Sequence, residues 1–169
     1  MEIFRLLCIK AGANINQSQL AKLLKVSPTA IANALALLDK EGLVKIDKSR
    51  EMTLNIVSLN RDSRKVMLLK RAENLGLIYE NGLAEFLEDN FPGCTIILFG
   101  SYSRGDDTEK SDVDIAVIGS KQKDLDMSIF GKKLDREIII NFYPSFKDIK
   151  KDLKENLCNG IVLAGGIEL

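Results

Sequence analysis

Two short apolar runs, each about the length of a strand, are the feature that most constrains how this chain can fold. The first, "TIILFG", covers residues 95–100 and ends in glycine, and the second, "SDVDIAVIG", covers residues 111–119. Such runs are typical of strands buried inside a sheet. The second run carries Asp112 and Asp114. A carboxylate on a buried strand is costly unless something cationic neutralises it. The sequence therefore predicts a sheet that carries an acidic site.

The residues around these runs predict a small α/β unit. Further strands are expected at 136–143 ("REIIINFY") and 160–169 ("GIVLAGGIEL"), and helices at about 77–91, 125–134 and 145–157. Strands mixed with helices favour a layered fold in which the helices cover the sheet.

Asp112 and Asp114 are placed to bind a divalent cation. Side chains alternate along a strand, so the two carboxylates share one face about 6.6 Å apart. Mg²⁺ takes oxygen ligands and keeps waters and substrate phosphates as the others. A pair of such ions about 3.5–4 Å apart clamps the attacking and leaving oxygens in phosphoryl transfer. The expected cofactor is therefore Mg²⁺ or Mn²⁺.

The turn after the first strand supplies groups that suit a phosphate. Gly100 lets the backbone approach a ligand closely. Ser101 offers its hydroxyl and amide to phosphate oxygens, and Arg104 can stabilise the charge of a triphosphate. Each feature alone is common, but an apolar strand, Gly-Ser, a spacer and then Asp-x-Asp in a second apolar strand form a specific combination.

This combination, "FGS…SDVDI", resembles the DNA polymerase beta nucleotidyltransferase superfamily. "GSYSRG" and "SDVDI" are most similar to the minimal prokaryotic nucleotidyltransferases, including those paired with small helical toxin partners. The resemblance covers residues 83–169. It implies that Gly100 and Ser101 hold the triphosphate of an NTP and that Asp112 and Asp114 hold two metal ions.

The chain departs from the family at the third acid, which binds one metal and helps to deprotonate the acceptor hydroxyl. Anchoring the pattern on Arg136 or on Pro144 places Ile139 at that position. Glu137 lies two residues earlier on the same strand face, about 6.6 Å away. Either Glu137 serves as the third catalytic acid with a shifted register, or the site lacks one.

Residues 1–60 predict a second, mainly helical domain. Helices are expected at 2–10, 17–26 and 28–41, with Asn16 and Ser27 as N-caps, and strands at 43–46 and 52–59. In this order, "LAKLLKVSPTAIANALALLDKEGLVKI" resembles the winged helix-turn-helix DNA-binding domains of prokaryotic regulators.

By that resemblance the third helix enters the major groove and the hairpin lies against the DNA backbone. The residues implied to face DNA are Thr29, Asn33 and Lys40, and those implied to contact phosphates are Lys45, Lys48 and Arg50. Because the third helix carries one basic residue and many winged helices bind protein, a protein-docking role stays open.

Charge and composition narrow the classes further. Residues 1–71 carry 13 Lys and Arg against 6 Asp and Glu, and residues 72–169 carry 11 against 18, which indicates two units with different partners. No apolar run approaches the roughly 20 residues of a membrane span. The three cysteines are far apart in the sequence, so we expect no disulfide framework. This cysteine usage predicts a cytoplasmic location. The absence of histidine excludes His-based catalysis.

The whole sequence predicts an α+β protein: a winged helix-turn-helix domain (1–60), a linker helix (61–82) and a nucleotidyltransferase domain with a mixed sheet (83–169). The first functional hypothesis is an enzyme that moves an NMP from an NTP, expected to be ATP, to an acceptor hydroxyl. The second is a DNA-binding regulator, for which a homodimer is plausible, whose transferase-like domain serves as a nucleotide sensor or protein-docking module. The third is a neutralising partner of a toxin.

Overall fold

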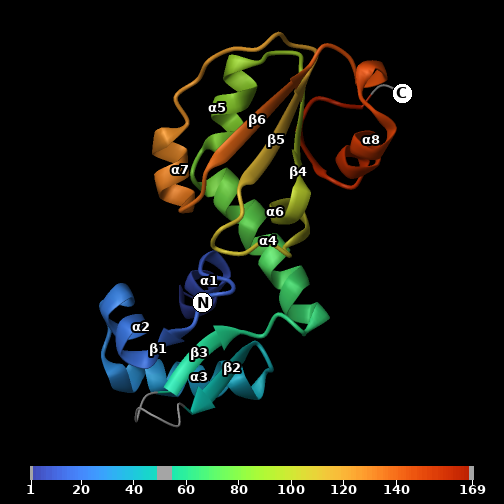
Figure 1. The fold of residues 1–169 in the computed structure, drawn as a ribbon. Helices are drawn as coiled ribbons and strands as arrows, with labels where there is room; N and C mark the ends of the chain where they lie inside the picture. The colour runs from blue at the N-terminus through green and yellow to red at the C-terminus, as the bar shows by residue number, and fades with distance from the viewer. Residues whose placement is uncertain (1, 49–54, 168–169) are drawn as a thin grey trace. The chain divides into compact units, whose positions relative to one another are not determined.

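The computed structural model describes residues 2–48 and 55–167, and the chain divides into two compact units (Figure 1). The N-terminal unit is Met1–Lys70 and the C-terminal unit is Arg71–Leu169. The division falls inside one helix, α4 (Arg64–Glu80), within the segment expected as a linker helix. Each unit has its own sheet, and the mixed α and β content confirms the predicted α+β class.

The described residues of the N-terminal unit form helices on a small antiparallel sheet with strand order β1-β3-β2. Its elements before α4 are α1 (Glu2–Ile9), β1 (Ile15–Asn16), α2 (Gln17–Leu24), α3 (Pro28–Lys40), β2 (Val44–Lys48) and β3 (Asn55–Leu59). Leu20, Ile31, Leu35 and Val57 have no exposed surface, and they join the helices to the sheet in one apolar core.

Local capping explains where α2 and α3 begin. The Asn16 side chain accepts from the Gln19 amide at 2.8 Å, and the Asn16 amide donates to the Gln19 side chain at 2.9 Å. Ser27 Oγ accepts from the Ala30 amide at 3.2 Å, and Pro28 is the first helical residue. Each cap satisfies an amide that a helix start leaves without an internal partner. The predicted starts of both helices are confirmed.

The strand β1 was not expected from the sequence. Ile15 pairs with Val57 and Asn16 with Ile56 in antiparallel register. A two-residue strand is too short to show the period-two alternation by which strands are recognised. It forms because β3 offers a free edge beside the start of α2.

The C-terminal unit contains a four-stranded mixed sheet with strand order β6-β5-β4-β7. The strands are β4 (Thr95–Phe99), β5 (Val113–Ile118), β6 (Ile138–Tyr143) and β7 (Ile161–Ala164). β5 runs parallel to β6 and antiparallel to β4, and β7 is antiparallel to β4. The four strands expected from the sequence are confirmed, with ends that differ by a few residues.

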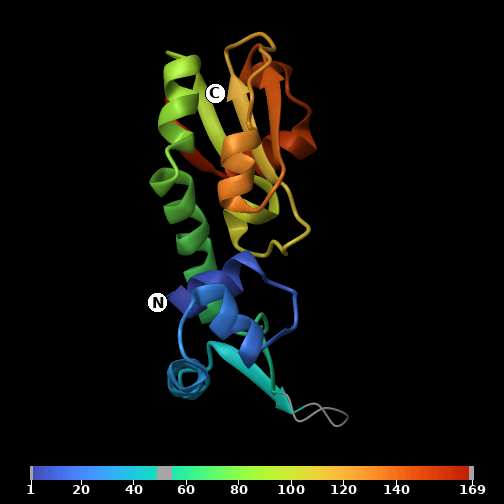
Figure 2. The same ribbon diagram turned by 90° about the vertical axis from the view of Figure 1, so that its left-hand side faces the viewer.

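Helices cover both faces of this sheet. They are α5 (Leu83–Asn90), α6 (Gly100–Arg104), α7 (Ser128–Leu134), the 3₁₀ turn η1 (Phe146–Asp148) and α8 (Lys151–Cys158). Ile97, Phe99 and Ala116 pack on Phe146 and Leu157 from η1 and α8. Figure 2 shows α5 along the opposite side of the sheet from η1 and α8.

The pairing of β4 with β5 shows which face carries the acidic strand positions. Ile97 is opposite Ala116, and Phe99 is opposite Asp114. Side chains at these positions point to the same face of the sheet, which is the face covered by η1 and α8. The predicted alternation along β5 therefore places Asp114 on the α8 side.

Among the described residues, no single helix has both the length and the apolar character to cross a bilayer. Only α2 and α3 taken together, across a bend of 112°, meet that test by length and composition.

Candidate active site

The turn between β4 and α6 brings Gly100 against Asp114. Gly100 has a φ of 72°, a left-handed conformation that favours glycine. A Cβ atom at this position would lie 2.5 Å from Asp114 Oδ2. The left-handed φ of Gly100 and the close approach of the Asp114 carboxylate both favour glycine here. The Gly-Ser turn therefore lies next to the second aspartate of the Asp-x-Asp strand.

The two aspartates sit at the start of β5. Asp112 is exposed just before the strand, and Asp114 is half-buried within it. Burial raises the pKa of Asp114, the negative charge of Asp112 raises it further, and Arg104 lowers it in part. Both causes of the rise disfavour a charged carboxylate, so a cation held between the two acids would relieve them.

Two carboxylates, one of them half-buried with a raised pKa, are a donor set that suits Mg²⁺ or Mn²⁺. Such an ion needs only one or two protein carboxylates when waters and substrate phosphates complete its shell. Asp112 and Asp114 would hold it. The residues present fit the predicted metal by their chemistry.

Ser101 and Arg104 lie on α6, which starts at Gly100. Ser101 is half-buried in the first turn, and its carbonyl accepts from the Gly105 amide at 3.0 Å where the helix ends. Arg104 is exposed, with Nε 3.1 Å from Asp106 Oδ2 and Nη1 3.4 Å from Asn156 Oδ1 on α8. These contacts hold the guanidinium on the side of the sheet that carries Asp114, whose pKa it lowers.

Glu137 comes directly before β6, and its side chain is exposed. Its carbonyl accepts from the Val113 amide at 2.8 Å, and in the following ladder Ile139 is the register partner of Asp114. The position beside Asp114 is therefore occupied by an apolar side chain. Within the described residues, no three His, Cys, Asp or Glu side chains come together as a metal-binding group. Glu137 and the two aspartates therefore do not form such a group.

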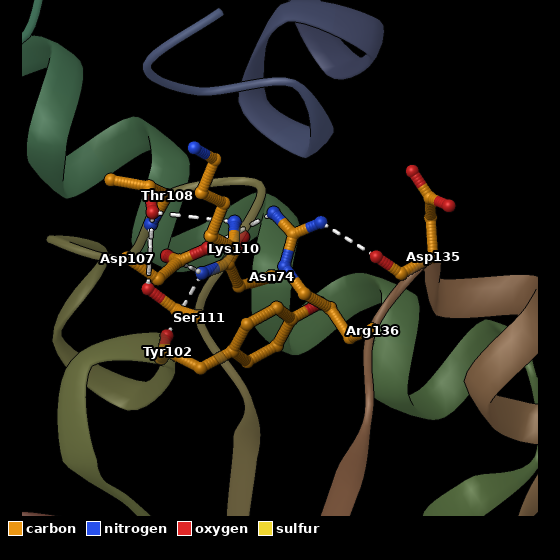
Figure 3. A network of polar contacts seen from close by, with 8 residues as sticks. All are labelled: Asn74, Tyr102, Asp107, Thr108, Lys110, Ser111, Asp135 and Arg136. Atoms are coloured by element: carbon orange, nitrogen blue, oxygen red, sulfur yellow. Dashed lines mark hydrogen bonds and ion pairs between the residues drawn. The ribbon is translucent and has the colours of Figure 1, made fainter.

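A buried polar cluster next to this site was missed by the sequence reasoning (Figure 3). The Asp107 and Arg136 side chains are 0% and 1% exposed, and Arg136 Nη2 lies 3.4 Å from Asp107 Oδ2. Asn74 Nδ2 donates to Asp107 Oδ1 at 2.7 Å and to the Tyr102 carbonyl at 2.8 Å. We define these three side chains, Asn74, Asp107 and Arg136, as the buried cluster. Asp107 stands in the polar run "RGDDTEK", where no local pattern marks it as buried.

Comparison with known proteins identifies the C-terminal unit. Residues 80–162 match the family model of the nucleotidyltransferase domain. Over these residues the C-terminal unit is similar to nucleotidyltransferase domains, in the part of the chain where the sequence resemblance lies.

A curated relative adds a second likeness to this domain family. A protein of Methanocaldococcus jannaschii named "putative protein adenylyltransferase" is 51% identical over 39 residues, which are 23% of this chain and 39% of that protein. The matched part is thus well under half of the relative's length. No solved structure matches the chain significantly.

The residues predicted to bind DNA lie in the N-terminal unit, and the structure describes most of them. Thr29, Asn33 and Lys40 are exposed on α3. Lys45 is exposed on β2 and forms an ion pair with Asp62. The remaining two are only partly or not described: Lys48 by its backbone in β2 alone, and Arg50 outside the described residues.

Proposed function

We propose that the nucleotidyltransferase domain transfers an NMP from an NTP to an acceptor hydroxyl with the help of a divalent cation. The observation that carries the proposal is the contact between the Gly100 turn and Asp114, a half-buried acid with a raised pKa. It puts a turn suited to phosphate and a pair of acids suited to a cation at one end of the sheet. The family match supports nucleotidyl transfer as the class of reaction.

In this proposal the acceptor oxygen attacks the α-phosphorus, the bond to the α,β-bridging oxygen breaks, and pyrophosphate leaves. Ser101 and the backbone of the turn bind the triphosphate, and Arg104 stabilises its charge. Asp112 and Asp114 would hold Mg²⁺ or Mn²⁺, which supplies positive charge to the reacting phosphoryl group when bound. Positioning and electrostatics do most of the work in such reactions.

The proton of the acceptor hydroxyl needs a base, and Glu137 is the candidate that the sheet offers. Glu137 and Ile139 point to one face of β6 because two residues separate equivalent positions on a strand. Its side chain is exposed, so it is free to contact an acceptor that enters from solvent. Glu137→Gln should then lower kcat while leaving nucleotide affinity unchanged, and an unaltered kcat would exclude this role.

We further propose ATP as the nucleotide and a protein hydroxyl as the acceptor. The support is the printed name of the M. jannaschii relative, a "putative protein adenylyltransferase". The discriminating assay offers α-labelled ATP together with a mixture of proteins or an RNA that has a free 3′ hydroxyl. Label on protein and none on RNA would support this acceptor class, and the opposite result would replace it.

The central experiment measures label transfer and pyrophosphate release by the full chain and its variants. Asp112→Asn and Asp114→Asn should each cost more than the about 10–100-fold typical of losing a group that merely supports a metal ligand. Asp124→Asn, which neutralises an exposed acid before α7, is the matched control and should keep full activity. Wild-type chain that neither binds metal–ATP nor transfers label would refute the proposal.

The N-terminal unit is proposed to be a winged helix-turn-helix domain that recruits the chain to DNA. Support comes from the order of its elements, the antiparallel hairpin β2–β3, and the exposed row Thr29, Asn33 and Lys40 on α3. DNA binding should weaken steeply as salt rises, because bound cationic side chains release counterions from the phosphates. Binding to no duplex even at low salt would favour a protein partner for this surface.

One observation favours a second candidate, a nucleotide-sensing regulator without transferase activity. Ile139, not an acid, is the register partner of Asp114. A sensor would bind metal–ATP through Asp112 and Asp114 without releasing pyrophosphate. Metal-dependent ATP binding with no turnover on any acceptor would therefore support the sensor over the enzyme.

A further inference from the structure

The buried cluster touches each of the three segments that carry the proposed site (Figure 3). Asn74 binds the carbonyl of Tyr102, which follows Ser101 in α6. Asp107 belongs to the loop between α6 and β5, which leads to Asp112. Arg136 directly precedes Glu137 at the start of β6. One group of side chains thus joins the phosphate turn, the acidic strand and the next strand.

The cluster is joined in a line. Asn74 Nδ2 is 2.7 Å from Asp107 Oδ1, and the other Asp107 oxygen is 3.4 Å from Arg136 Nη2. Arg136 Nη1 also donates to the Asp135 carbonyl at 2.8 Å, which orients its guanidinium. Asp107 is the central member, since one carboxylate oxygen faces each neighbour. Its loss would remove these bonds between the α6 side of the cluster and the β6 side.

A second set of bonds shapes the loop that follows Asp107. The Thr108 amide donates to Ser111 Oγ at 3.0 Å, the two hydroxyls lie 3.3 Å apart, and the Lys110 amide donates to Thr108 Oγ1 at 3.3 Å. Ser111 is followed directly by Asp112. A hydrogen-bonded turn therefore connects Asp107 to Asp112, so the position of Asp107 influences that of Asp112.

A buried ion pair is a poor choice if stability alone is needed. Apolar side chains of similar volume often serve as well or better, and the attested benefit of a buried polar group is that it selects one geometry among several. The cluster bonds to the segment that carries the Gly100–Ser101 turn and to the loop that leads to Asp112, so it can select the spacing between them. A ligand that contacts both segments together would depend on that spacing.

We propose that Asp107 is a positioning residue, which sets the Gly100–Ser101 turn against Asp112 and Asp114 through Asn74 and Arg136 so that both can contact one metal–nucleotide. The proposal rests on the proposed function. It assigns no contact with substrate to Asp107. Without Asp107 the turn would still bind triphosphate, but the turn and the two acids would no longer be spaced to contact the same metal–nucleotide.

The test compares nucleotide affinity with and without metal. The probe is the α,β-methylene analogue of ATP, which is not cleaved, titrated into the full chain by calorimetry in EDTA and again in Mn²⁺. Wild type should bind more tightly with Mn²⁺. Asp107→Asn should keep its affinity in EDTA within about twofold and lose about 10-fold or more of the Mn²⁺-dependent gain, the range seen when a group supporting a metal ligand is removed.

Glu109→Gln is the matched control. It removes one negative charge from the same loop, but Glu109 is half-exposed and lies outside the buried cluster. It should leave the Mn²⁺-dependent gain as in wild type. A purely structural role for Asp107 would lower the melting temperature and leave the gain unchanged in the folded fraction, which contradicts the proposal.

Asn74→Ala repeats the test from the other side of the cluster and decides the matter if Asp107→Asn does not fold. It removes the bonds to Tyr102 and Asp107 and leaves the ion pair between Asp107 and Arg136 in place. It should reduce the Mn²⁺-dependent gain in the same way. An unchanged gain in whichever variant folds would overturn the positioning role while the proposed function stands. A wild type without any Mn²⁺-dependent gain would instead reject the proposed function, and this proposal with it.

Discussion

Replacing Gly100 by alanine tests two effects of the turn separately, its effect on stability and its effect on cation binding. Gly100 has a φ of 72°, and a Cβ there would be 2.5 Å from Asp114 Oδ2 and 3.3 Å from Asp114 Cγ. The left-handed backbone costs an alanine about 1–2 kcal/mol. The steric overlap adds little, because the carboxylate is the far end of a side chain that can rotate away. For a unit of this size the loss corresponds to a fall of about 4–16 °C in melting temperature.

The rotation is what should abolish function. Once Asp114 turns away from Gly100, its oxygens no longer share a site with Asp112, and the Mn²⁺-dependent gain in ATP-analogue affinity should fall by about 10–100-fold. Gly93→Ala is the matched control, since Gly93 has a φ of 76° and nothing lies within 4 Å of its Cβ position. It should lower the melting temperature by a similar amount and keep the gain.

Thermal unfolding should therefore show a similar fall in melting temperature for both variants. Calorimetric titration should show loss of the Mn²⁺-dependent gain in affinity for Gly100→Ala alone. A Gly100→Ala chain that retains the full Mn²⁺-dependent gain would show that the contact with Asp114 has no part in cation binding. If both variants lost the Mn²⁺-dependent gain equally, the loss would be due to general destabilisation. Either result would refute the reasoning from the turn.

Three further predictions concern charge and capping. Asp114→Asn should raise the melting temperature at pH 7 in metal-free buffer: the raised pKa of Asp114 means that the folded state holds its proton more tightly than the unfolded state, so stability is lost as pH rises from the unfolded pKa through the folded pKa. The rise in melting temperature should shrink below that pH window. An Asp114→Asn variant less stable than wild type at pH 7 would contradict the raised pKa of Asp114. Arg104→Gln should shift the pH midpoint of Mn²⁺ binding upward, because Arg104 lowers the pKa of Asp114, and an unmoved midpoint in a pH series of titrations would exclude that contact. Ser27→Ala should destabilise the N-terminal unit by about 0.5–2 kcal/mol in chemical denaturation through loss of the bond from the Ala30 amide, and Ser18→Ala, an exchange inside α2, is its control.

Elements with local signals could be predicted from the sequence, and the buried cluster could not. Asn16 and Ser27 predict the starts of their helices because a cap acts within three residues. The apolar runs that contain Phe99 and Asp114 predict strands by their composition. The family resemblance implied that the Gly100 turn and Asp114 serve one site, and the pairing of Phe99 with Asp114 in the β4–β5 ladder brings them together.

Asn74, Asp107 and Arg136 come from three distant parts of the chain, and each alone looks like a surface residue. Only the fold shows that they meet in the interior. The same limit applies to Glu137: the sequence gives its strand face, but its distance from the aspartates depends on tertiary register. The pairing of Asp114 with Ile139 is a property of the β5–β6 ladder that no local pattern encodes.

The half-buried acid at position 114 fits the proposed cationic ligand in both proposals, the enzyme and the nucleotide sensor. Burial and the neighbouring Asp112 both disfavour its charge, and Arg104 compensates only in part. Next along the same face, Ala116 and Ile118 are buried and apolar, so this fold accommodates neutral side chains there without difficulty. A sheet that used residue 114 only for packing would be more stable with a neutral group. In both proposals, the enzyme and the nucleotide sensor, a bound cation would offset this cost, and the two differ in whether pyrophosphate leaves afterwards.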